Sequence, residues 1–128
     1  MRTLSPPATR NGAVSVEFAV VAPIIFLFFL AALELTAINL VRQTAGNAAY
    51  EAARKRIIAG SSSDAARQEA IRLLKAVCPA RNVSIDVQDE SDGVLVSIAV
   101  PVKDNSWGLG RFTGELTIRK QCRLRQAW

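Results

Sequence analysis

The chain has 128 residues and contains no histidine, only two cysteines and few aromatic residues. Without histidine it lacks both the commonest general base and the commonest metal ligand of proteins. Cys78 and Cys122 lie far apart and form no CxxC pair, which argues against a zinc site. The sequence also has no P-loop and no nucleophile elbow. We therefore expect a protein that is not an enzyme and that holds no metal or cofactor.

What the chain has instead is one long apolar run. Half of its residues are hydrophobic, and many of these lie in residues 13–41, with no charge between Phe18 and Leu33. A helix needs about 20 residues to cross the hydrocarbon of a bilayer. A core helix of so small a protein should show a polar stripe, and residues 18–33 show none. We predict that residues 13–41 form a retained transmembrane helix, because the run is longer than a cleavable secretory signal and lacks its small-x-small site.

The remaining residues, 42–128, are predicted to form one small α+β domain. The first helix should continue to about Ala59 and end at Gly60. "SSSD" (61–64) is typical of the start of a second helix, which Pro79 stops shortly after Cys78. The apolar face of this second helix is expected to comprise Ala66, Ala70, Leu73, Leu74 and Val77.

Alternating apolar residues after Pro79 predict an antiparallel sheet of about three strands. A turn is expected at "ESDG" (90–93), with Asp92-Gly93 as the hairpin signal, and a glycine-rich loop at residues 103–114. We expect Trp107 and Phe112 of that loop to fold back onto the sheet. The expected inward residues of the three strands are Val83, Ile85 and Val87, then Val94, Val96, Ile98 and Val100, then Leu116, Ile118, Cys122 and Leu124.

One acid stands at the mouth of the apolar run, in "NGAVSVEFAVVAP". Glu17 is the fifth residue after Gly12, and a short leader with Arg2 and Arg10 precedes it. An isolated charge near hydrocarbon is costly, so this carboxylate needs an explanation. One explanation without further partners is that the side chain reaches the lipid headgroups. Ala13 and Glu17 would lie one helical turn apart on the same face.

The first 54 residues of the sequence resemble the TadE-like family, the minor pilins or pseudopilins of Tad/Flp-type pilus systems. The matching motifs are Gly12-Ala13, Val16-Glu17-Phe18-Ala19, Pro23, Glu34-Leu35, Arg42-Gln43, Asn47-Ala48-Ala49 and Ala53-Arg54. Leu35 stands where the family more often has Phe, and Ala52 where it has Gly.

The resemblance implies a pilin-like fold and a structural role in assembling a pilus or secretion filament. It implies cleavage by a prepilin peptidase between Gly12 and Ala13, with Glu17 and Phe18 as part of the recognised sequence. The new ammonium of Ala13 would then lie beside Glu17, or Glu17 would meet the ammonium of a neighbouring subunit. Implied partners are the peptidase, other pilin-like subunits and an inner-membrane assembly platform.

A second acid and a row of polar residues follow on the same helix. Glu34 is followed by Thr36, Asn39, Gln43 and Asn47 at helical spacing, within a region rich in alanine. We interpret Glu34, Asn39, Gln43 and Asn47 as assembly contacts with a partner helix. Ordinary packing of residues 34–53 against the protein's own outer domain is an equally good interpretation at this stage.

Orientation is the point on which the sequence arguments conflict. Positive residues after the span would place the C-terminal side in the cytoplasm. The leader motif and the two cysteines favour the opposite, with residues 1–12 as a cytoplasmic leader and residues 42–128 as an extracytoplasmic domain of a bacterial inner-membrane protein. We predict this second orientation, one disulfide between Cys78 and Cys122, and a role connected with adhesion.

Two alternatives to a pilin-like subunit stay open on sequence grounds. The first is an unprocessed single-pass protein whose outer domain binds a ligand. The second is a basic domain in the cytoplasm that touches nucleic acid, since the formal net charge is +5. A solvated surface near a membrane explains that charge more simply, so we expect no nucleic-acid partner.

Overall fold

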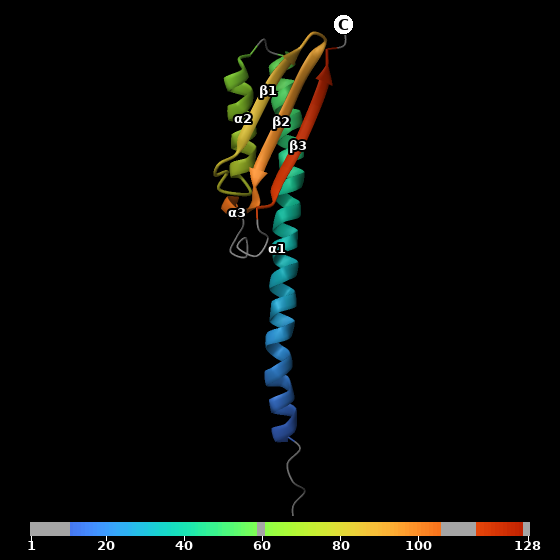
Figure 1. The fold of residues 1–128 in the computed structure, drawn as a ribbon, viewed down its shortest axis with the longest axis vertical. Helices are drawn as coiled ribbons and strands as arrows, with labels where there is room; N and C mark the ends of the chain where they lie inside the picture. The colour runs from blue at the N-terminus through green and yellow to red at the C-terminus, as the bar shows by residue number, and fades with distance from the viewer. Residues whose placement is uncertain (1–10, 59–60, 106–114, 127–128) are drawn as a thin grey trace, which may run out of the picture. The chain divides into compact units, whose positions relative to one another are not determined.

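The computed structural model describes residues 11–58, 61–105 and 115–126. The elements follow in the order α1 (Asn11–Ile58), α2 (Ser63–Lys75), β1 (Ser84–Glu90), β2 (Gly93–Pro101), α3 (Val102–Asn105) and β3 (Thr117–Arg125), as Figure 1 shows. The chain divides into two compact units, one up to Leu33 and one from Glu34 onward. A long apolar helix, a second helix and a three-stranded antiparallel sheet confirm the predicted α+β fold.

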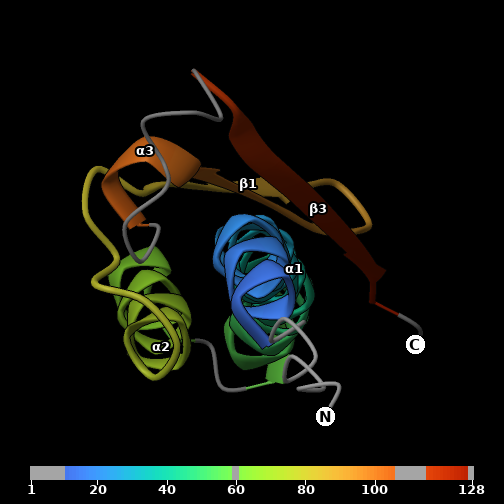
Figure 2. The same ribbon diagram turned by 90° about the horizontal axis from the view of Figure 1, so that it is seen from below.

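The second unit packs two helices against one face of the sheet. Figure 2 shows α2 on one side of the sheet together with the part of α1 that belongs to this unit. Five alanines of α1 are fully buried in the shared core: Ala45, Ala48, Ala49, Ala52 and Ala53. Because these side chains are only methyl groups, the helix backbone can lie close to the elements it packs against.

Helix α2 begins at the predicted cap but ends at Lys75, before the predicted end near Cys78, so Val77 lies beyond the helix. The hydroxyl of Ser62 caps the helix by accepting the N–H of Ala65 at 3.3 Å. Asp64 in the first turn and Lys75 in the last complement the helix dipole. Ala66, Ala70 and Leu74 are buried, as expected for the predicted apolar face, and burying Leu74 stabilises the fold by about 2 kcal/mol.

The sheet has the order β1-β2-β3, with both neighbouring pairs antiparallel. In the central strand β2 every second side chain faces the helices and is buried, as predicted: Val94, Val96, Ile98 and Val100. On β3 only Ile118 is buried, while Cys122 and Leu124 are half-buried at the margin of the core. The core therefore lies under the middle of the sheet.

The hairpin forms at the predicted turn, with one shift in its centre. Glu90 pairs with Gly93, so Ser91 and Asp92 make the loop and Gly93 is the first residue of β2. A Cβ on Gly93 would lie 2.1 Å from the backbone oxygen of Leu124. Glycine is needed here because β3 approaches closely, rather than to form the turn.

Some predictions for the region between β2 and β3 are wrong, and others lie outside the described residues. Leu116 precedes β3 and its side chain is 45% exposed, although it was predicted to face inward. Its carbonyl accepts the N–H of Val102 at 2.9 Å, which fixes the residue just before the strand begins. Lys103 begins no loop, because residues 102–105 form the short helix α3. The predictions for Gly60, Trp107 and Phe112 fall outside the described residues.

The predicted disulfide is not formed, since Cys78 and Cys122 are both free thiols. Cys78 follows α2, which packs against β1, and its thiol donates to the carbonyl of Leu74 at 3.5 Å. Cys122 lies on β3, with β2 between it and β1. Partial burial raises the pKa of the Cys122 thiol.

Candidate functional site on the long helix

The predicted processing residues lie in the first two turns of α1. Gly12 and Ala13 are exposed, and a Cβ on Gly12 would meet nothing within 4 Å. Glu17 and Phe18 follow in the second turn, both exposed, with Phe18 at 70%. Since α-helical residues four apart are neighbours, the backbone nitrogen of Ala13 lies about one turn, some 5–6 Å along the axis, from Glu17. The structure thus presents both the predicted cut and the acid on an accessible helix surface.

The first compact unit carries an apolar surface that extends around the whole helix. From Ala13 to Leu33 every side chain is exposed, apart from Ala22, which is half-buried. The most exposed of the large ones is Phe28 at 74%. By length and composition α1 can cross a membrane, and within the described residues it is the one helix that can. This segment is compatible with a single-pass membrane anchor.

The part of α1 in the second unit has two faces with different surroundings. The alanine face is buried in the protein's own core, as described above. Asn39, Gln43 and Asn47, spaced four residues apart, remain exposed on the opposite face, and Tyr50 continues this face at 48% exposure. The two interpretations of residues 34–53 therefore apply to different faces. The alanines pack against the protein's own domain, and the polar row is a surface that a partner helix can reach.

Glu34 does not share the exposed face with the other predicted contact residues. Its side chain is 9% exposed and lies on the same helix face as the core residues Val41 and Ala45. Oε1 has no hydrogen-bond partner within the part of the chain that the structure describes. A buried carboxylate oxygen without a partner is energetically costly. The sequence does not indicate this burial. Glu34 is followed by polar residues at helical spacing, and Asn39, Gln43 and Asn47 among them are exposed.

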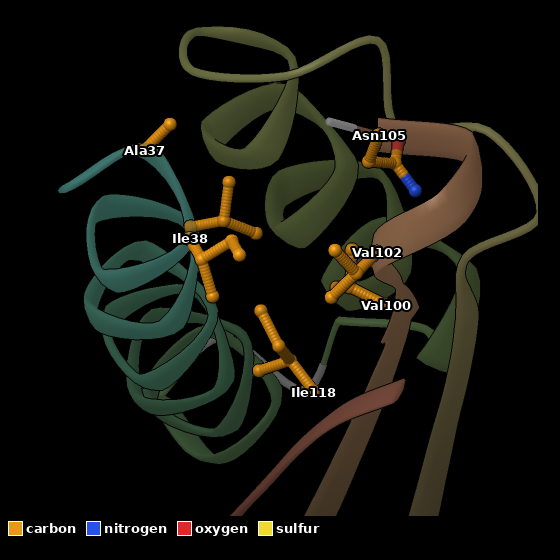
Figure 3. A pocket seen from close by; sticks show the side chains of 7 residues that line it. Ala37, Ile38, Val100, Val102, Asn105 and Ile118 are labelled. Atoms are coloured by element: carbon orange, nitrogen blue, oxygen red, sulfur yellow. The ribbon is translucent and has the colours of Figure 1, made fainter. Parts of the chain in front are cut away.

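A small apolar cavity lies between α1 and the sheet in the second unit (Figure 3). Ala37, Ile38 and Val41 line it from the helix, opposite Val100, Val102, Asn105 and Ile118. Its volume of about 10 Å³ is close to that of one water molecule, so it is too small for a small-molecule ligand.

A wider, open groove runs between the last turns of α1 and the middle of α2. It has a volume of about 320 Å³ and is lined by Glu51, Arg54, Lys55, Ile58 and Glu69. Across it the ammonium of Lys55 lies 3.4 Å from a carboxylate oxygen of Glu69. A hydrogen bond from Arg72 lowers the pKa of Glu69, and Lys55 adds to this effect. Within the described residues no group of three or more histidine, cysteine, aspartate or glutamate side chains could hold a metal ion.

Sequence reasoning missed one residue that holds the second unit together. The Asn105 side chain accepts the N–H of Arg81 at 2.8 Å and donates to the carbonyls of Arg81 and Pro101 at 2.9 and 2.8 Å. It ties the loop after α2 to the end of β2. Asn105 is buried, yet the sequence places it in a polar stretch that looks like an ordinary loop.

Comparison with known proteins finds a family whose sequence profile matches part of this chain. Residues 12–54 match the sequence profile of the TadE-like protein family. This confirms the predicted family resemblance, and the matched range includes Gly12, Glu17, the apolar segment and the polar face of α1. Comparisons with curated proteins and with solved structures found no match.

Proposed function

Since residues 12–54 carry the TadE-like sequence, we propose that this chain is a pilin-like structural subunit that takes part in assembling a Tad-type pilus or secretion filament. The family match supports the association with a Tad pilus. The exposed apolar segment supports membrane anchoring. The proposed role is structural, and no enzymatic step is assigned to the chain.

We further propose that a prepilin peptidase cuts the chain between Gly12 and Ala13. The cut would remove the basic leader on the cytoplasmic side and leave the outer domain on the other side of the inner membrane. The free ammonium of Ala13 would then stand one turn from Glu17. Two opposite charges at this distance cost far less near a membrane than the lone carboxylate does. The remaining proposed partners are other pilin-like subunits and the inner-membrane assembly platform.

The exposed row Asn39, Gln43 and Asn47 is the surface that we assign to subunit contact. Amide side chains can hydrogen-bond across helices, and this row is left uncovered by the protein's own domain. Glu34 is placed differently, because it is buried. We propose an assembly role for Glu34 only because it lies at the start of the second unit.

The proposal is tested at the N-terminus of the mature protein. Intact-mass and N-terminal peptide analysis of the full chain, purified from cells with an active prepilin peptidase, should find Ala13 as the first residue. A Gly12→Ala variant should keep its leader. If the wild-type chain keeps its leader in such cells, the proposed processing is wrong.

A charge variant tests the role of Glu17. Glu17→Ala should be inserted and cut normally, while the amount of assembled pilus falls about tenfold, the equilibrium effect of losing roughly one ion pair. Glu115→Ala removes an exposed carboxylate outside α1 and serves as the matched control. Normal pilus levels in Glu17→Ala would refute the ion-pair explanation.

A further inference from the structure

The two outer strands of the sheet carry opposite charges on its solvent-facing surface. The register places Ser84, Asp86, Gln88 and Glu90 of β1 on that surface, and Thr117, Arg119, Gln121, Arg123 and Arg125 of β3 on it as well. The β1 edge is therefore acidic and the β3 edge is basic. This separation follows from the register rather than from the overall charge.

Both strands are edges of the described sheet, so each has backbone N–H and C=O groups that no further strand pairs. Figures 1 and 2 show no other labelled element beyond β3. Helix α2 lies near β1 but on the other face of the sheet, and the solvent-facing Asp86 and Gln88 remain exposed. The acidic and the basic side chains are thus both accessible.

The charged groups of the two edges are unequally satisfied within one chain. Glu90 accepts a hydrogen bond from Arg123 at 2.9 Å across the sheet. Among the residues that the structure describes, Asp86 accepts a hydrogen bond from the side chain of Gln88 at 2.7 Å and forms no ion pair, and Arg119 forms none either. Asp86 and Arg119 are therefore the two charges that a contact between edges would newly pair.

The spacing of the side chains on the two edges matches when one strand is moved by two residues. In a single chain Ser84 lies in the same row as Arg119. Against a second copy, a shift of about 7 Å along the strand would bring Asp86 beside Arg119 and Glu90 beside Arg123. Gln88 would face Gln121 between them. Opposite charges in directly facing positions stabilise a strand pair, and like charges destabilise it.

Direction follows from the topology and from the proposed anchoring. Strands β1 and β3 run parallel to each other because both are antiparallel to β2. Copies anchored in one membrane point the same way, so β1 of one copy would meet β3 of the next in parallel. Two β3 edges would instead oppose several positive side chains, which disfavours pairing of like edges.

We propose that the β1 edge of one copy pairs in parallel with the β3 edge of a second copy, with Asp86 facing Arg119 and Glu90 facing Arg123. This partner assignment rests on the proposed function, since it takes both copies to be anchored in the same membrane. The contact joins two different surfaces, so each added copy leaves one free edge at either end. It produces an open row of subunits rather than a closed dimer.

A disulfide test uses the full chain in its own membrane, in a Cys122→Ser background. Ser84→Cys and Thr117→Cys are introduced together, and the cells are treated with diamide as the oxidant of the two thiols. Within one chain these positions are separated by β2, about 10 Å or more, which is too far for a bridge. Between paired copies they face each other. We expect a ladder of disulfide-linked multimers from the double variant and none from either single variant.

A charge exchange tests the specificity of the contact. Asp86→Lys alone, or Arg119→Glu alone, should lower the cross-linked fraction about fivefold, and the two together should restore it. Neither change breaks an ion pair among the residues that the structure describes. Lys75→Glu alters the charge by the same amount at an exposed residue at the end of α2, outside the sheet, and should leave the ladder unchanged.

Three outcomes would overturn the proposal: no ladder from the double cysteine variant, equal cross-linking from the single variants, or no rescue by the charge exchange. Failure here differs from failure of the proposed function. Processed chains and normal pili without a ladder would refute only the edge contact. An uncut chain that still forms the ladder would refute the pilin-like function and leave the edge contact standing.

Discussion

At the scale of single residues, two glycines differ in whether an added methyl group would fit. Gly46 lies in α1 with nothing within 4 Å of an added Cβ. Gly93 begins β2, where the added Cβ would lie 2.1 Å from the Leu124 carbonyl oxygen and 2.9 Å from Cα of Arg125. The first position tolerates a side chain and the second does not, although both residues have the same chemistry.

Alanine substitutions should therefore change stability in opposite directions. Gly46→Ala should stabilise the fold by about 0.5–1 kcal/mol, because alanine restricts the unfolded chain and favours the helix. Gly93→Ala should destabilise it by about 2 kcal/mol or more, since β3 must move away from β2. Thermal unfolding of the full chain in detergent measures both. Equal shifts of the same sign would contradict this account of Gly93.

At the scale of elements, the part of α1 from Glu34 to Ile58 has one face that packs in the core and one that is exposed. One face is buried beneath the sheet through alanines, and the other exposes a row of amides. A change on the first face should affect folding, and a change on the second should affect assembly. This division can be tested with one substitution on each face.

Ala49→Leu should destabilise the fold by about 1–3 kcal/mol, because Ala49 is fully buried and leaves no room for a larger side chain. Gln43 is exposed, so Gln43→Ala should change stability by less than about 0.5 kcal/mol. It should nevertheless reduce the amount of assembled pilus. Thermal unfolding in detergent and pilus yield from cells separate the two effects. A stable Gln43→Ala protein with normal pilus yield would remove the exposed row from the assembly surface.

At the scale of the whole molecule, the proposed orientation places everything after the apolar segment outside the cytoplasm. Lys75→Cys in a Cys122→Ser background provides an exposed thiol at the end of α2, while Cys78 stays buried. A membrane-impermeant maleimide should label this thiol fully in spheroplasts before lysis. Labelling that appears only after lysis would place the domain in the cytoplasm and reverse the proposed topology.

Much of the fold was predictable because its signals are local. The exposed apolar segment, the cap at Ser62, the apolar face of α2 and the alternation along β2 each depend on residues close together in the chain. The site was predictable in part. Gly12, Glu17 and the row from Asn39 to Asn47 are exposed where the sequence suggested, but exposure alone does not test their roles.

Local sequence was enough to predict the apolar segment, the two longer helices, the approximate strands and the match to the TadE-like family, because composition and periodicity act over a few turns or pleats. Three features appear only once the chain is folded: Glu34 is buried, Cys78 and Cys122 are free thiols, and Asn105 connects two distant segments. The tertiary structure also decided that acidic and basic residues gather on opposite edges of the sheet. These features arise from pairing between distant segments, and strand order and register, which set that pairing, cannot be read from any one stretch of sequence.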